Sequence, residues 1–452
     1  MNPRCLRNGV ITLLPIMLCA MPAFAAEPHP PKFDSGDTAW MLTSVALVLM
    51  MTIPGLALYY AGMVRKKNIL GTLMQAFTVT CLVTIAWTVS GYSIAFTGGH
   101  GATAPYFGDT SRFMLRGLAT NFNSAFVLAP GSPAAVTETI PESVFMMFEM
   151  GFAILTPALI AGAFADRMKF SALCIFMTGW SILSYAPIAH WVWAPTGWLG
   201  AGVFGLPGAA DFAGGTVVHI NAGVAGLVSC LMLGKRVGYG TENMSPFNLS
   251  LALIGASLLW VGWFGFNAGS AGAANGRAGM AMMATQIATA AAALAWMFAE
   301  WIVQGKPTML GIISGAVAGL VAITPASGFV LPGPAIIIGI AAGVGCFFAA
   351  TKMKRFFGYD DSLDTWGVHG IGGIIGALFT GVFAYGPLSG GIHAGGVKQF
   401  ESQCIAVCVT LVWSGLVSFG LLKIIDRAIG IRVTEEEERM GLDKSLHGET
   451  LG

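Results

Sequence analysis

Charged residues are scarce in this 452-residue sequence: Asp, Glu, Lys and Arg together make up 10% of the chain, against a hydrophobic share of 55%. A soluble globular domain carries roughly 25% charged residues, so the composition excludes that class. The net charge of +1 gives no basic surface for a nucleic acid. The apolar runs are long rather than short and alternating, which excludes a membrane β-barrel. We therefore predict an all-α, polytopic membrane protein.

Cysteine provides neither a disulfide framework nor a metal cluster. Cys5 and Cys19 lie near the N-terminus, and the other six of the eight cysteines fall in apolar segments without metal-ligand spacing. We also find no nucleophile or cofactor motif beside the histidines discussed below. We therefore expect no enzyme activity, no cofactor and no metal. Glycine, by contrast, is abundant, with 61 residues, which favours close packing of helices in a membrane.

The first 25 residues predict a secretory signal peptide. Arg4 and Arg7 precede a short apolar core at 10–21, and residues 23–25 read Ala-Phe-Ala, a typical cleavage site. The alternative is a first transmembrane helix. With a signal peptide, the mature chain begins outside the cytoplasm and has a membrane domain at 26–430 and a polar tail at 431–452.

Eleven apolar segments are long enough to cross a bilayer. Beginning outside, eleven spans place the C-terminus in the cytoplasm. The distribution of Lys and Arg residues supports this orientation, because the loops assigned to the cytoplasm hold eleven of them and the external loops hold four. The predicted spans are 38–62, 69–97, 142–164, 170–193, 214–234, 248–270, 280–303, 308–327, 331–351, 367–386 and 400–425.

A weak internal repeat connects the fifth and tenth spans. His219 and His369 each begin the pattern V-H-x-x-x-G-x-x-G, which places two glycines on the same helix face as the histidine. Two sets of five spans would form an inverted repeat, with the eleventh span as an extra helix. Chance similarity between glycine-rich helices is the alternative.

A histidine inside a membrane span is energetically expensive and is by default a candidate functional residue. Burial favours the neutral imidazole, which has one donor and one acceptor. A neutral pair can share a hydrogen bond, bind a small polar molecule or relay a proton. Helix–helix bonding is the alternative for a single histidine. Two histidines without Cys or carboxylate neighbours make a poor zinc site. Because the two histidines occur in repeated settings, we predict that His219 and His369 line a pore.

Polar and aromatic residues gather near the predicted outer face. Asp211 begins the fifth span, where it can cap the helix or favour a cation at the outer mouth. Trp193 ends the fourth span, and with the hydroxyl of Ser270 it can hold a small cation by cation–π attraction and hydrogen bonding. A simple membrane anchor is the alternative for such a tryptophan.

Several motifs then carry a resemblance. They are D-F-A-G-G-T-V-V-H-I-N at 211–221, G-W-F-G-F-N-A-G-S at 262–270, G-V-H-G at 367–370, the segment 162–170, and the tail residues from Arg439 to Glu449. In this order, from about residue 38 to the C-terminus, the sequence resembles the ammonium transporter family of Amt, MEP and Rh proteins, most of all its bacterial Amt branch. Three departures are a longer loop between Trp193 and Asp211, an extended loop at 98–138, and Glu149, where some members have an amide.

The resemblance implies a homotrimer in the bacterial inner membrane, with eleven spans, an external N-terminus, a cytoplasmic C-terminus and one narrow pore per subunit. It also implies a cytoplasmic tail that docks a PII-type signal protein. Carried over to this sequence, the family's roles are an external ammonium site at Trp193, Phe152 and Ser270 with Asp211 in support, a gate at Phe152 and Phe266, and a pore lining at His219, His369, Trp263 and Thr324.

Residue chemistry and resemblance lead to the same expected mechanism. A bare ion should not enter a dry pore, so ammonium, or its analogue methylammonium, would lose its proton outside and cross as the neutral amine. Proton passage along the two histidines is a further hypothesis. An ammonium sensor acting through its tail is the alternative function, although the short segment at 431–452 favours transport with regulation.

Overall fold

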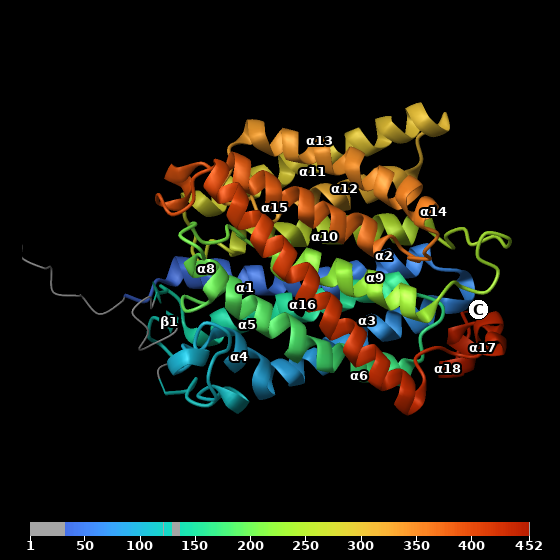
Figure 1. Cartoon of the computed structure of the whole chain (residues 1–452), viewed down its shortest axis with the longest axis horizontal. Helices are drawn as coiled ribbons and strands as arrows, with labels where there is room; N and C mark the ends of the chain where they lie inside the picture. The colour runs from blue at the N-terminus through green and yellow to red at the C-terminus, as the bar shows by residue number, and fades with distance from the viewer. Residues whose placement is uncertain (1–31, 121, 129–135, 452) are drawn as a thin grey trace, which may run out of the picture.

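The computed structural model describes residues 32–120, 122–128 and 136–451. The predicted signal peptide at 1–25 lies outside these residues. Long helices run side by side along the longest axis of the molecule, and their ends form two opposite faces (Figure 1). One face carries β1, α4 and α8, and the other carries the C-terminal helices α17 and α18. The described residues form an all-α fold apart from one small hairpin, as the composition predicts.

Eighteen α-helices are described. They are α1 (Ser35–Met50), α2 (Ala57–Met63), α3 (Ile69–Ala86), α4 (Tyr92–Phe96), α5 (Glu142–Ile160), α6 (Phe170–Trp180), α7 (Ala186–Trp193), α8 (Trp198–Ala201), α9 (Asn221–Leu233), α10 (Leu249–Gly269), α11 (Gly276–Gln304), α12 (Met309–Ile323), α13 (Pro332–Phe348), α14 (Lys354–Phe357), α15 (Ile371–Phe383), α16 (Val397–Ile429), α17 (Glu435–Met440) and α18 (Leu442–His447).

Shorter helical segments and one hairpin complete the described chain. The π-helical segments are η1 (Met51–Leu56), η3 (Trp87–Gly91), η7 (Ser181–Tyr185), η8 (Gly215–Ile220), η9 (Ala349–Met353) and η10 (Trp366–Gly370). The 3₁₀ segments are η2 (Lys66–Asn68), η4 (Gly101–Thr103), η5 (Phe113–Leu115), η6 (Ala161–Phe164) and η11 (Gly386–Ser389). Strands β1 (Val127–Leu128) and β2 (Val136–Thr137) pair antiparallel.

Each of the eleven predicted spans coincides with an apolar helical stretch. In the described part of the chain, ten stretches are long and apolar enough to cross a membrane. The helix at the eighth predicted span, α12, is not among these ten. It has 15 residues and is about 22 Å long, which is shorter than a hydrocarbon core of about 30 Å. It ends at Ile323, and the chain continues in tight turns, with Ala326 N donating to Ile323 O at 2.9 Å. The span predicted at 308–327 is therefore part helix and part turn.

Side-chain caps fix where several helices begin. Asn248 accepts hydrogen bonds from the first-turn amides of α10, Asn275 does the same for α11, and the Thr308 hydroxyl accepts one from Gly311 N in α12. These contacts satisfy amides that have no partner within the helix. The ends of these long apolar helices are thus set by polar residues at the faces of the bundle.

Glycine allows the close packing that its abundance predicts. A Cβ added at Gly339 of α13 would lie 2.4 Å from the carbonyl oxygen of Ala288 in α11. One added at Gly343 would lie equally close to the carbonyl oxygen of Ala292, one turn further along α11. These helices therefore touch backbone to backbone, which is the usual role of small residues in membrane helix packing.

The tail packs against the membrane domain. Lys67 Nζ donates to the carbonyl oxygens of Glu438 and Arg439 at 2.9 and 2.6 Å. Leu442 N donates to Asn68 Oδ1 at 2.8 Å, and Val433 N donates to Arg167 O at 3.1 Å. The tail is therefore a docked element of the fold, where its polar composition alone also allowed a freely solvated end.

Candidate functional site

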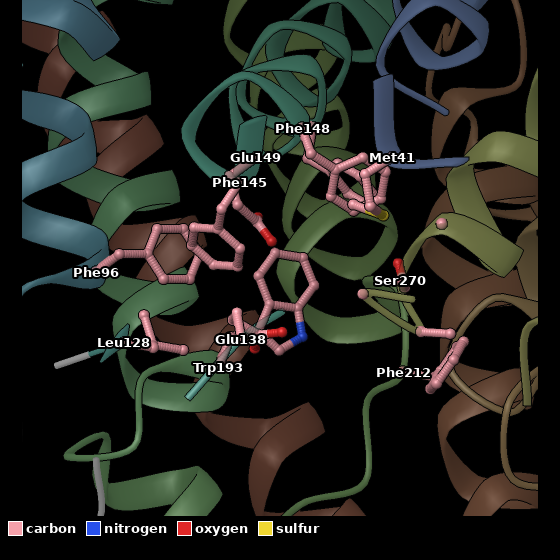
Figure 2. Close-up of a pocket in the computed structure, with 14 residues that line it drawn as sticks. Met41, Phe96, Leu128, Glu138, Phe145, Phe148, Glu149, Trp193, Phe212 and Ser270 are labelled. Atoms are coloured by element: carbon pink, nitrogen blue, oxygen red, sulfur yellow. The ribbon is translucent and has the colours of Figure 1, made fainter. Parts of the chain in front are cut away.

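A pocket opens at the end of the bundle that carries the β-hairpin. Figure 2 shows its residues, which come from α1, α4, β1, α5, the end of α7, the turn after α10 and two loops. Its volume is about 170 Å³, which suits a very small molecule. The lining residues are Met41, Phe96, Leu128, Glu138, Phe145, Phe148, Glu149, Phe152, Trp193, Phe212, Gly269, Ser270, Ala271 and Gly272.

Trp193 and Ser270, the two residues predicted to hold a cation, both line this pocket. The indole nitrogen of Trp193 donates to the backbone oxygen of Asp211 at 2.9 Å, which fixes the plane of the ring. The hydroxyl of Ser270 donates to Phe266 O at 2.9 Å, so its oxygen keeps lone pairs for an N–H donor. The pocket therefore offers an aromatic surface and a hydroxyl acceptor.

Asp211 turns away from the pocket and caps the start of η8. Its carboxylate accepts hydrogen bonds from the amides of Gly214, Gly215 and Thr216 at 2.6–2.8 Å, and another from the Thr216 hydroxyl. These bonds satisfy amides at a helix start that would otherwise be unpaired. Of the two interpretations of Asp211, the geometry favours the structural one.

Two phenylalanine rings close the bottom of the pocket. Phe152 and Phe266 stack with their centroids 4.0 Å apart and an interplanar angle of 22°. The Phe152 and Trp193 rings are perpendicular, with centroids 5.8 Å apart. Both phenylalanines are almost completely buried. The two residues predicted as a gate thus form a closed stack.

His219 and His369 lie directly beyond this stack. The His219 ring is 6.1 Å from Phe266 and 5.4 Å from His369, measured between centroids. The two Nδ1 atoms are 3.4 Å apart, so one ring can donate to the other when both are neutral. His219 Nε2 has no hydrogen-bond partner among the described residues. It is therefore free to bond with a small polar molecule in the path.

Trp263 and Thr324 form the adjoining wall. The indole nitrogen of Trp263 donates to Thr324 Oγ1 at 2.8 Å, and the Thr324 hydroxyl donates to Leu320 O at 2.8 Å. The Trp263 ring stacks on His219 at a centroid distance of 5.4 Å. Thr324 thus fixes the ring that supports His219.

The two histidines lie in the first turns of two membrane-length helices, Gly215–Leu233 and Trp366–Phe383, which start from opposite ends of the bundle. Asp211 stands eight residues before His219, and Asp361 stands eight residues before His369. Asp361 caps η10, accepting from Thr365 N at 3.0 Å and Trp366 N at 2.7 Å. Asp364, which is closer in sequence to His369, pairs with Lys354 instead. The spacing of eight residues was the signal that could have identified Asp361, and the opposed caps support the predicted inverted repeat.

The comparisons with known proteins agree with one another. The sequence model described as "Ammonium Transporter Family" matches residues 39–451. The chain belongs to the ammonium transporter family. The resemblance seen in the sequence motifs is thereby confirmed.

Among ammonium transporters, a Bacillus subtilis protein named "Ammonium transporter" is 46% identical over 418 residues, covering 92% of this chain and 98% of the relative. The crystal structure of Saccharomyces cerevisiae Mep2 is 33% identical, with a TM-score of 0.78, over 89% of this chain and 91% of that one. A structure titled "Sensor Amt Protein" is 26% identical, with a TM-score of 0.80, over 91% and 98% of the two chains.

In this ammonium transporter, contacts between neighbouring side chains connect the pocket at Trp193, through Phe152 and Phe266, with the histidine pair. Sequence reasoning missed Glu138, Met41 and Phe212 as lining residues, because they come from loops and from a helix distant in sequence. In the described chain, no group of three His, Cys, Asp or Glu residues could hold a metal ion.

Proposed function

We propose that this chain recruits NH₄⁺ at the external pocket, removes its proton and conducts NH₃ past the two histidines into the cytoplasm. The observation that carries the proposal is the order of the groups along the path. Trp193 and Ser270 line the pocket, the stack of Phe152 and Phe266 closes it, and His219 follows.

Recruitment uses the pocket's aromatic surface and its acceptor. An ammonium ion over the face of an indole ring is attracted by the ring quadrupole, with a gain of about 0.5–2 kcal/mol depending on desolvation. The Ser270 oxygen can accept an N–H from the same ion because its own hydrogen is engaged with Phe266 O. Asp211 supports the site through its backbone oxygen, which holds the Trp193 ring.

Passage beyond the gate favours the neutral molecule. Moving an unpaired charge into a dry apolar path is strongly unfavourable, whereas NH₃ is neutral and both donates and accepts hydrogen bonds. The neutral histidine pair supplies a matching donor and acceptor along the path. K⁺ has no proton to lose, so the same path discriminates against it despite its similar size.

The test is methylammonium uptake into proteoliposomes by the wild type, His219→Ala and His369→Ala. We expect both substitutions to change the rate or the ion selectivity, and replacement by Asp or Glu to retain partial transport. His100→Ala is the matched control, because the side chain of His100 is 87% exposed. If both pore variants matched the control in rate and selectivity, the proposed path would be wrong.

The fate of the proton is tested separately. If protons follow along His219 and His369, adding ammonium to proteoliposomes produces an inward current as well as amine uptake. If amine enters without current, the relay is ruled out and transport is electroneutral. The 3.4 Å contact between the two Nδ1 atoms is the geometry that such a relay would need, and the current measurement decides whether protons use it or stay outside.

We further propose that the chain lies in a bacterial inner membrane with the pocket outside, preceded by a signal peptide at 1–25. Its basic side chains support this orientation, because Arg65, Arg167 and Arg236 gather at the end of the bundle where the tail docks. A reporter fused after 452 and mass spectrometry of the mature N-terminus test the proposal. An external tail would contradict it.

The remaining proposals concern assembly. The resemblance supports a homotrimer and a PII-type partner at the tail, 431–452, and at the adjacent loops. Native mass measurement tests the first, and retention of purified PII protein by the wild type but not by a tail deletion tests the second. The likeness to a structure titled "Sensor Amt Protein" makes an ammonium sensor the second candidate function. Ammonium-dependent partner binding without any amine flux would favour that function over transport.

A further inference from the structure

A buried carboxylate faces the external pocket. Glu149 lies on α5, one turn before Phe152, and is 9% exposed. It lines the pocket together with Trp193 and Ser270, and its Oε2 atom has no hydrogen-bond partner in the described chain. Figure 2 shows the carboxylate directed toward the Trp193 ring. Such a group is unfavourable unless something in the pocket pairs with it, because a buried charge without a partner is strongly destabilising.

The described lining of the pocket contains neither Lys nor Arg, so it supplies no cationic side chain as a partner for the Glu149 carboxylate. The charged group with the clearest influence on Glu149 is a second carboxylate, Glu138, on the loop between β2 and α5. Glu138 lines the same pocket and is half-buried. The pocket therefore presents two carboxylates, which a cation or a proton from outside would neutralise.

The other titratable groups near Glu149 are already committed or are weak acids. Tyr92 and Tyr185 both lie close enough to be affected by its charge. Tyr92 donates its hydroxyl to Glu142 at 3.1 Å, and Glu142 also pairs with Arg112 at 2.7 Å. Phenols hold their protons at neutral pH. Of these described neighbours, the two carboxylates facing the pocket are the groups suited to accept a proton there.

We propose that Glu149 is the base that takes the proton from ammonium in the external pocket, and that Glu138 returns it to the outer solution. The inference rests on the proposed function. One N–H bond of NH₄⁺ breaks and one O–H bond forms on the Glu149 carboxylate, so NH₃ and a neutral carboxylic acid remain. The proton then passes to the Glu138 carboxylate and from there to external water.

Each position suits its part in this transfer. Glu149 is one helical turn from Phe152, so the neutral product forms beside the gate that it must pass. Glu138 is nearer the rim, where a Cβ added at Gly272 would lie 3.0 Å from its Oε2 atom. Burial raises the pKa of the Glu138 carboxyl, which brings it closer to neutral pH, where a proton carrier works best.

The test is methylammonium influx into proteoliposomes over a range of external pH for the wild type, Glu149→Gln, Glu149→Asp and Glu138→Gln. The matched control is Glu401→Gln, which removes an exposed carboxylate near the start of α16. Without its base, Glu149→Gln should depend on amine that is already neutral. Its uptake should then be at least about tenfold below wild type at acid pH and rise about tenfold per pH unit.

The other variants define the remaining outcomes. Glu149→Asp should keep part of the wild-type profile, and Glu138→Gln should be slowed at acid pH, while Glu401→Gln should match the wild type. A wild-type rate and pH profile in Glu149→Gln would overturn the inference, and so would a loss that persists at high pH, since that indicates a steric defect. Failure of the proposed function looks different: the wild type itself, or the histidine variants, would then give the unexpected result.

Discussion

Gly223 lies against the backbone of Gly370, so closely that an added Cβ would be 2.4 Å from the Gly370 nitrogen. Gly223 follows His219 by four residues, and Gly370 follows His369 directly. Gly373 has a related contact on the other half, since a Cβ there would lie 3.1 Å from Cβ of His219. The repeated His-x-x-x-Gly pattern thus marks where the two helices cross and bring the imidazoles together.

Gly223→Ala should therefore separate the histidines. Overpacking of this kind costs about 1–3 kcal/mol and is relieved when the helices shift apart. We expect methylammonium uptake to fall by about tenfold or more, which corresponds to roughly 1.4 kcal/mol in the barrier. Gly420→Ala is the control, because a Cβ at that helical position meets nothing within 4 Å. Equal rates in the two variants would show that the close crossing is not required.

Thr324→Val should weaken the wall beside His219. The substitution keeps the shape of the side chain but leaves the Trp263 N–H without its acceptor. We expect a loss of about 1 kcal/mol in stability and slower uptake. The measurement is thermal unfolding in detergent together with transport. Thr410→Val is the control, since the buried Thr410 hydroxyl has no partner in the described chain and its removal should be neutral.

Arg236→Gln should destabilise the tail-bearing end in a pH-dependent way. Burial disfavours the charge on Asp360, but the hydrogen bonds and charge of Arg236 outweigh it and hold the pKa of that carboxyl below its usual value. The wild-type pair therefore stabilises the fold above the unfolded pKa of Asp360, and this contribution is lost as pH falls through the lower folded pKa. Without Arg236, we expect a loss of about 3–5 kcal/mol at neutral pH.

In the Arg236→Gln variant, the shift in the pKa of Asp360 reverses its direction. Asp360 without its partner should have a raised pKa, so its protonated form is favoured in the folded state and the deficit should shrink as pH falls. Unfolding temperatures of wild type and variant at neutral and acid pH check this. Arg439→Gln is the control, because Arg439 is on the surface and its ion pairs are screened by solvent. A deficit independent of pH would contradict the assignment.

Glu438→Ala should release the tail. The buried Glu438 carboxylate accepts from Val237 N at 2.7 Å and pairs with Arg432 at 2.8 Å, so it ties α17 to the loop after α9. We expect protease cleavage within 431–452 to be at least about tenfold faster, since losing a buried charged acceptor costs roughly 1.5–3 kcal/mol. Glu436→Ala on the exposed side of the same helix should leave cleavage unchanged. Equal cleavage in both would contradict a docked tail.

Much of the path could be predicted from sequence, because its chemistry is rare in a membrane. His219 and His369 stood out as polar residues in apolar spans, and the aromatics near Trp193 had a stated cation-binding rationale. Asp361 was missed because Asp364 is nearer to His369 in sequence. The capping carboxylate is instead the one that stands eight residues before the histidine, as Asp211 does in the other half. Glu138 was missed because a loop residue has no periodicity that points toward a pocket.

Span limits were less predictable than span existence. Hydropathy located α12 but gave 308–327, although its helix ends at Ile323. Hydropathy measures apolar content, and the turns after Ile323 are apolar too. The docking of the tail also could not be read from its charges, because those charges are equally suited to water. Its contacts with Lys67 and Asn68 depend on residues more than 350 positions earlier in the chain.

The contact between His219 and His369 joins two halves of the polypeptide, so the proposed path runs between the halves and not through either one. Each half contributes one histidine, so neither half alone forms this path. Tilting one half against the other would separate the two histidines, so we expect the close crossing at Gly223 and Gly370 to be a condition for selectivity.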